Sequence, residues 1–166
     1  MDSSVMVLKD VLKHVVIAQN DDLVHMDLGV PRDLRSRIDV RVPQAVILTG
    51  VRRCGKSTLL KQLMKEQALF NYFNFEDQRV VSFDLSDFEK LEEVFSELYK
   101  KTDYYFFDEI QNVPQWELFI RKILNEGKKC IITGSNASLL SKELGTRLTG
   151  RHLDYELLPF SYAEFL

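Results

Sequence analysis

With 166 residues, 45% of them hydrophobic and 11% aromatic, the chain is large and apolar enough to bury its own core, which excludes an intrinsically disordered segment. Its 22 Lys and Arg residues against 25 Asp and Glu residues give a net charge of −3, which does not indicate a nucleic-acid-binding domain, although a local basic patch stays open. Two cysteines, Cys54 and Cys130, are too few for a disulfide framework or a four-cysteine zinc site.

The N-terminal residues carry no pattern of export or membrane insertion. Residues 1–4 are acidic, whereas a signal peptide begins with basic residues. Lys9, Asp10 and Lys13 interrupt the apolar stretch that follows, which leaves it too short to cross a membrane. We therefore expect a cytoplasmic protein with no membrane partner.

Apolar residues recur at helical spacing near the N-terminus and predict an amphipathic helix over residues 4–19. Turn-forming and charged residues follow, so residues 20–41 are interpreted as a connector with room for one short helix. Together these segments predict an N-terminal helical extension over residues 1–41.

From residue 42 onward, short apolar runs alternate with amphipathic stretches. The predicted strands lie at residues 45–49, 70–75, 104–107, 130–133 and 152–158, and the predicted helices at residues 56–69, 86–101, 114–125 and 137–140. Strands that alternate with helices predict an α/β domain with a mostly parallel sheet of about five strands. Near the C-terminus, Ser161 to Glu164 form a capping-box pattern, which predicts a helix that continues in a longer protein. A frayed natural tail is the alternative interpretation.

The segment from Gly50 to Ser57 fits the phosphate-loop pattern G-x-x-x-x-G-K-[ST], between a predicted strand and a predicted helix. Its two glycines allow a tight turn whose N–H groups surround an anion, Lys56 supplies positive charge, and the Ser57 hydroxyl is suited to Mg²⁺. A chance match at a structural glycine turn is the alternative. The residues expected around the phosphates are Gly50, Val51, Arg52, Arg53, Cys54, Gly55, Lys56, Ser57 and Thr58.

Two acidic residues, Asp108 and Glu109, directly follow the apolar run 104–107. This is the Walker B pattern, in which Asp108 holds Mg²⁺ and Glu109 polarises or deprotonates a water molecule. A plain acidic loop after a strand is the alternative interpretation.

Polar residues also follow the predicted strand 130–133. Asn136 is the first candidate for positioning an attacking water molecule, and Ser135 is the second. The alternative is that one of them merely caps the helix predicted at residues 137–140.

Four arginines stand at positions where they can contact phosphates. Arg147 and Arg151 precede the last predicted strand, and one of them is expected to reach the γ-phosphate of a neighbouring subunit, unless both are only surface charges. Arg52 and Arg53 either contact phosphate or, as we favour, pair with nearby acidic side chains.

These motifs, taken in order, resemble prokaryotic AAA-superfamily ATPases of the AAA_14 type, which typically carry a C-terminal domain of unknown function, DUF4143. The resemblance covers about residues 42–166. The segments that carry it are Gly50 to Ser57, Tyr72 to Arg79, Phe107 to Gln111, Thr133 to Ala137, Leu144 to Arg151 and Leu158 to Tyr162.

The resemblance implies a three-layer P-loop NTPase fold of the additional-strand, catalytic-glutamate type, with strand order 5-1-4-3-2. It implies Lys56 and Ser57 at the phosphates and Mg²⁺, Asp108 at Mg²⁺, Glu109 as the base and Asn136 as a sensor. It also implies that an arginine acts in trans within a homo-oligomer. The lid and C-terminal domain expected of this family lie beyond residue 166, so residues 42–166 are expected to be a truncated nucleotide-binding core.

The leading functional hypothesis is therefore Mg²⁺-dependent ATP hydrolysis, with an unidentified protein partner. ATP is favoured over GTP by the resemblance, and no guanine-recognition motif of the N-K-x-D type is present. The alternatives are a nucleotide-gated binding module with little hydrolysis, and a small-molecule kinase that uses the same loop. A nucleic-acid role is a further alternative that the charge balance does not indicate.

Overall fold

The computed structural model describes residues 7–26, 33–51, 54–135, 148 and 150–158. Five strands form one sheet, and every neighbouring pair in it is parallel, in the order β2-β3-β4-β1-β5. The predicted strand order is thus confirmed. The strands are β1 (Ala45–Gly50), β2 (Asn71–Asn74), β3 (Tyr104–Asp108), β4 (Lys129–Ser135) and β5 (His152–Glu156). The α-helices are α1 (Lys9–Val24), α2 (Lys56–Met64), α3 (Asp87–Leu98) and α4 (Trp116–Asn125).

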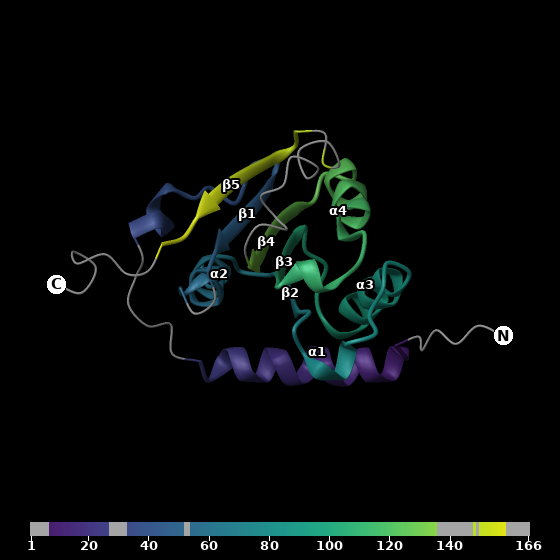
Figure 1. Cartoon of the computed structure of the whole chain (residues 1–166). Helices are drawn as coiled ribbons and strands as arrows, with labels where there is room; N and C mark the ends of the chain where they lie inside the picture. The colour runs from purple at the N-terminus through teal and green to yellow at the C-terminus, as the bar shows by residue number, and fades with distance from the viewer. Residues whose placement is uncertain (1–6, 27–32, 52–53, 136–147, 149, 159–166) are drawn as a thin grey trace.

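The helices cover both faces of the sheet, which gives three layers (Figure 1). On one face, α3 and α4 pack on alternate strand residues such as Phe107 and Ile132. On the other face, α2 packs on the intervening residues, such as Phe106 and Ile131. The central strands are buried on both faces because their residues are apolar in succession, as a covered parallel sheet requires.

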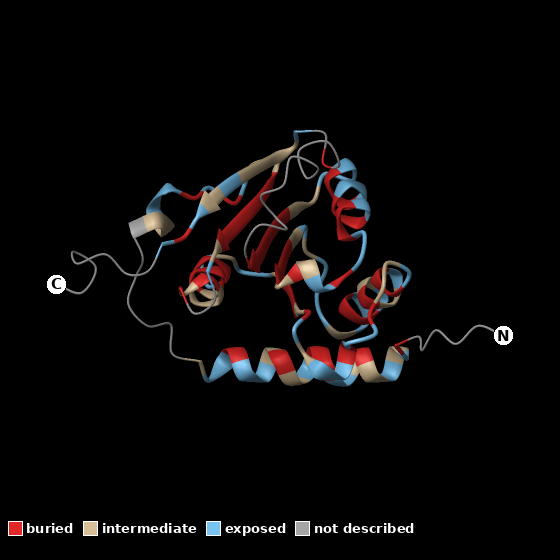
Figure 2. Cartoon of the chain, in the orientation of Figure 1, coloured by how far each residue is buried: buried red, intermediate tan, exposed pale blue. Residues whose placement is uncertain are grey.

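Helix α1 lies along the β2 edge of the sheet, beside α3 (Figure 1). Its buried residues, red in Figure 2, lie on the side of the helix toward the domain, and its outer side is exposed. The predicted bounds of this helix, residues 4–19, are wrong at both ends: the helix begins at Lys9, after Leu8 in an extended conformation, and ends at Val24. The Asn20 amide donates to the Val16 carbonyl within the helix, and Leu23 is buried against the α2 layer, so the helix gains a further turn.

The Gln19 side chain of α1 pairs with the backbone of the edge strand β2. Its carboxamide accepts a hydrogen bond from the Asn74 N–H at 2.9 Å and donates one to the Asn74 carbonyl at 3.0 Å. Asn74 lies beside Asp108 in the β2-β3 register. A single helical side chain thus satisfies both backbone groups that the last residue of the edge strand directs outward.

Helix α2 ends at Met64, earlier than the predicted residue 69. Beyond it, the Glu66 and Gln67 N–H groups bond to carbonyls three residues back, at Leu63 and Met64. Such bonds tighten and end a helix. The remaining predicted helices and strands match observed elements within a few residues at each end. The helix predicted at residues 137–140 and the one predicted from Ser161 lie outside the described residues.

We expect Val16→Ala to lower the free energy of unfolding by about 2 kcal/mol, since it removes two methyl groups from a fully buried site in the core beneath α1. Ile17→Ala is the matched control, because Ile17 is 40% exposed and its truncation should change stability by no more than about 0.5 kcal/mol. Urea denaturation measures both. Equal effects would mean that α1 is not an integral part of the folded unit.

Candidate functional site

The loop between β1 and α2 turns on two glycines with positive φ angles. Gly50 ends β1 with φ of 154°, and Gly55 precedes α2 with φ of 95°. A Cβ atom on Gly50 would lie 2.5 Å from the Leu157 carbonyl oxygen and 2.7 Å from the Cys54 sulfur. Only glycine therefore lets β1 pass this close to the end of β5 and lets the loop fold back over it.

Lys56, the first residue of α2, lies inside this loop rather than on the surface. Its side chain is 4% exposed, and its ammonium donates to the carbonyls of Gly50 at 2.9 Å and Val51 at 3.1 Å. These bonds compensate for the desolvation of a buried cation. The loop thus holds a fixed positive charge at the N-terminal end of α2, where backbone N–H groups are left unpaired.

The Asp108 carboxylate, at the end of β3, is 1% exposed and has hydroxyl donors on both oxygens. Thr133 of β4 donates to Oδ1 at 2.5 Å and Ser57 of α2 at 3.1 Å. Tyr72 of β2 donates to Oδ2 at 3.3 Å. Three elements therefore hold this carboxylate beside the first turn of α2.

Glu109 leaves the sheet in the left-handed conformation, with φ of 53°. Its N–H donates to the Thr133 hydroxyl at 2.9 Å. Its half-buried carboxylate accepts hydrogen bonds from Gln111 at 2.6 Å and from Ser135, at the end of β4, at 3.2 Å. The two adjacent carboxylates thus accept hydrogen bonds from different side chains.

The structure brings together several of the residues singled out from the sequence. Lys56 contacts the Gly50 end of the loop, Ser57 contacts Asp108, and Ser135 contacts Glu109. Cys54 is buried in the loop, and Val51 is exposed. Asn136, Arg147, Arg52 and Arg53 lie outside the described residues.

Arg151 does not lie at this site in its own chain. It stands just before β5, where its carbonyl accepts a hydrogen bond from the N–H of Ala45, the first residue of β1. Its guanidinium bonds to Asn125 at the end of α4. Strand β1 therefore separates Arg151 from Gly50.

Sequence reasoning missed Tyr72, Thr133 and Gln111. Thr133 carried a usable signal, since it is a polar residue in an apolar strand next to the Asp108 strand. The sequence around Tyr72 gave no signal of a role at the site, because aromatic residues are common in buried strands. Burial and the Asp108 charge both raise the pKa of Tyr72, so its hydroxyl stays protonated and remains a donor.

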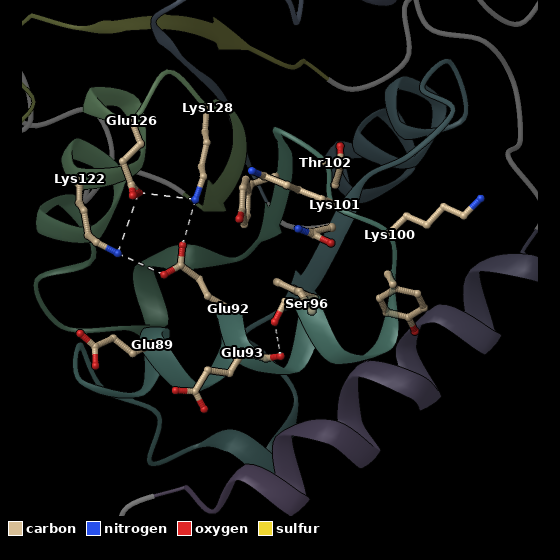
Figure 3. A pocket seen from close by; sticks show the side chains of 14 residues that line it. Glu89, Glu92, Glu93, Ser96, Lys100, Lys101, Thr102, Lys122, Glu126 and Lys128 are labelled. Carbon is tan, nitrogen blue, oxygen red and sulfur yellow. Dashed lines mark hydrogen bonds and ion pairs between the residues drawn. The ribbon is translucent and has the colours of Figure 1, made fainter.

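A hollow of about 570 Å³ lies away from this site, between α3 and α4 at the amino ends of β2 and β3 (Figure 3). Four of its charged side chains form ion pairs with one another: Glu92 contacts Lys122 at 3.1 Å and Lys128 at 3.4 Å, and Glu126 contacts Lys128 at 3.5 Å. The phosphate-loop pattern and the two adjacent carboxylates lie elsewhere, so we place the candidate site at the loop and Asp108 instead.

The described part of the chain has neither a metal-binding cluster nor a membrane-spanning helix. No three His, Cys, Asp or Glu side chains there form a group that could hold a metal ion. In the same part of the chain, every helix is too short or too polar to span a bilayer.

A parallel sheet of this order, with a glycine-rich loop from β1 to α2 and a carboxylate at the end of β3, defines the P-loop nucleoside-triphosphatase fold. The model of the AAA_14 family, described as an AAA domain, matches residues 42–166, and the chain belongs to this family. The resemblance noted from the sequence motifs is thus confirmed.

The chain is similar to two curated proteins, both described only as uncharacterized. One, from Methanocaldococcus jannaschii, is 36% identical over 166 residues, which is 98% of this chain and 37% of the relative. The other, from Haemophilus influenzae, is 37% identical over 131 residues, covering 72% of this chain and 32% of the relative. The chain therefore spans about a third of the length of these relatives.

Among solved structures, similar chains include AMPPCP-bound DnaA from Aquifex aeolicus, at 15% identity and a TM-score of 0.47, over 89% of this chain and 49% of that one. The ORC1 protein of Aeropyrum pernix in complex with DNA is similar at 14% identity and a TM-score of 0.46, over 97% of this chain and 48% of that one.

Proposed function

We propose that the chain binds Mg·ATP and hydrolyses it, with a water molecule activated by Glu109. The observation that carries this proposal is the 3.1 Å contact between the Ser57 hydroxyl and the Asp108 carboxylate, beside the buried Lys56. A hydroxyl and a carboxylate oxygen are suitable ligands for Mg²⁺, and a lysine at a helix N-terminus suits phosphate groups. These residues therefore fit the cofactor that the family implies.

In this proposal, the loop residues from Gly50 to Thr58 surround the phosphates, and Lys56 offsets their charge. Ser57 and Asp108 hold the Mg²⁺, which would neutralise charge on the phosphate oxygens. The loop's glycines and the unpaired N–H groups of α2 supply the remaining donors.

Glu109 is proposed as the general base. Its carboxylate is adjacent to Asp108 in sequence but bonds to Ser135 and Gln111 instead. It is therefore free of the cluster around Asp108 and able to accept a proton from water. Asn136 is proposed to position that water, since it directly follows Ser135 in the chain.

We propose that hydrolysis takes place in a homo-oligomer in which Arg147 or Arg151 reaches a neighbouring chain's nucleotide. The position of Arg151 at the far end of β1 from Gly50 supports a role in trans. We also propose that residues 42–166 form the nucleotide-binding core, with residues 1–41 as a helical extension packed against it.

Phosphate release per chain, measured over a range of protein concentrations with Mg²⁺ or with EDTA, tests this function. We expect release that needs Mg²⁺ and that rises per chain with concentration, because an arginine in trans requires assembly. Tight Mg·ATP binding without release at any concentration would instead support a nucleotide-gated binding module. Transfer of phosphate to an acceptor other than water would support a kinase.

A further inference from the structure

We propose that Tyr72 is a positioning residue for the divalent cation, because its hydroxyl fixes the orientation of the Asp108 carboxylate. This inference rests on the proposed function, in which Asp108 helps to hold Mg²⁺. It adds a residue of β2 to a site otherwise built from the phosphate loop and the ends of β3 and β4.

The register of the sheet explains how Tyr72 reaches Asp108. Tyr72 lies beside Phe106, and Asn74 lies beside Asp108, in parallel strands. Residues two apart on a strand share a face, so Tyr72, Phe106 and Asp108 all face the α2 layer. The long phenol side chain extends along this face and brings its hydroxyl to 3.3 Å from Asp108 Oδ2.

The three hydroxyl donors divide between the two carboxylate oxygens. Ser57 and Thr133 both donate to Oδ1, and Tyr72 donates to Oδ2. Thr133 also accepts the Glu109 N–H, so its single hydroxyl proton is committed to Asp108. Among the described residues, Tyr72 alone donates a hydrogen bond to Oδ2, since the other two donors bond to Oδ1. Without Tyr72, Oδ2 would lose this hydrogen bond, and the carboxylate would be held through Oδ1 alone.

The surroundings of Tyr72 keep its hydroxyl in place. The side chain is buried, and the Lys61 ammonium lies 6.0 Å from the centre of its ring, a cation–π distance. A cavity of about 490 Å³, lined by Tyr72, Lys61 and polar residues of α1 and β2, borders the ring. A change of the Tyr72 side-chain rotamer would break the contact of the ring with Lys61 as well as the hydrogen bond to Asp108.

Binding of Mn²⁺ to the full chain, in the presence of a non-hydrolysable ATP analogue, tests this role without turnover. The signal of free Mn²⁺ in electron paramagnetic resonance gives the dissociation constant. We expect Tyr72→Phe to weaken Mn²⁺ binding by about tenfold, the lower end of the effect of losing a group that orients a metal ligand. Affinity for the analogue in EDTA should not change, because the phenylalanine ring preserves the packing.

Tyr105→Phe is the matched control. It also removes a buried tyrosine hydroxyl, but at the amino end of β3, beside Lys128 and away from Asp108. Its Mn²⁺ affinity should equal that of the unmodified chain. Unchanged Mn²⁺ affinity in Tyr72→Phe would overturn the inference, and so would a loss of analogue affinity in EDTA, which would indicate a purely structural role.

Asp108→Asn separates this inference from the proposed function. If Asp108→Asn weakens Mn²⁺ binding and Tyr72→Phe does not, only the role of Tyr72 is wrong. If Asp108→Asn leaves Mn²⁺ binding intact, the metal does not depend on Asp108, and the proposed function fails together with the inference.

Discussion

Glu109→Gln is expected to lower the rate of ATP hydrolysis by about 10³-fold while leaving Mg·ATP binding intact. Removing a general base costs on the order of 10²–10⁴ in rate. Glutamine has the same shape as glutamate, so contacts with Ser135 and Gln111 can be retained. It cannot accept a proton from water at neutral pH. Single-turnover phosphate release, measured alongside binding of a fluorescent ATP analogue, separates the two effects.

Glu93→Gln is the control for this change. Glu93 lies on the exposed side of α3, where its carboxylate pairs with Lys9 at 3.2 Å, and its loss should leave the hydrolysis rate unchanged. A Glu109→Gln variant that still hydrolyses ATP at near the normal rate would show that another group, or the substrate itself, accepts the proton.

Gly50→Ala is expected to lower the free energy of unfolding by about 3 kcal/mol or more and to abolish nucleotide binding. The new Cβ would overlap the Leu157 carbonyl, whose residue donates its N–H to Thr49 at 2.7 Å. The backbone at Gly50 is also at a positive φ, which is strained for alanine. Relief requires β5 to move away from β1 next to the phosphate loop.

Gly127→Ala measures the cost of placing alanine at a positive φ without any steric overlap of the new Cβ atom. Gly127 has φ of 81°, but nothing lies within 4 Å of its added Cβ. This variant should therefore lose only about 1 kcal/mol, the cost of a left-handed alanine, and should bind the nucleotide normally. Urea denaturation of both variants makes the comparison. Equal losses would show that the contact between Gly50 and Leu157 is not what requires glycine.

The sheet was predictable from the sequence because each strand is a short apolar run and each helix has one apolar face. The run from Ala45 to Leu48 and the aromatic run 104–107 contain no charged residue to place at a surface, so both belong inside a covered sheet. The order of the strands came from the resemblance, since spacing alone does not state which strands are neighbours.

The contacts within the site were only partly predictable. The phosphate loop and the adjacent carboxylates are contiguous motifs, so Lys56, Ser57 and Asp108 could be named from spacing. The roles of Tyr72 and Thr133 depend on the register between strands that are far apart in sequence. The end of α1 was missed for a related reason, because Asn20 bonds within its own helix although its residue type usually favours a turn.

The position of α1 has a consequence for biosynthesis. Helix α1 is synthesised before β2 and α3, the elements against which it packs, and the last residue of α3 is Leu98. At roughly 5–20 residues per second, a ribosome needs about 4–15 seconds to make the intervening chain. During that time Leu12, Val15 and Val16 have no partner surface to cover them. The apolar side of helix α1 is thus exposed during synthesis until the edge strand and helix that cover it have been made.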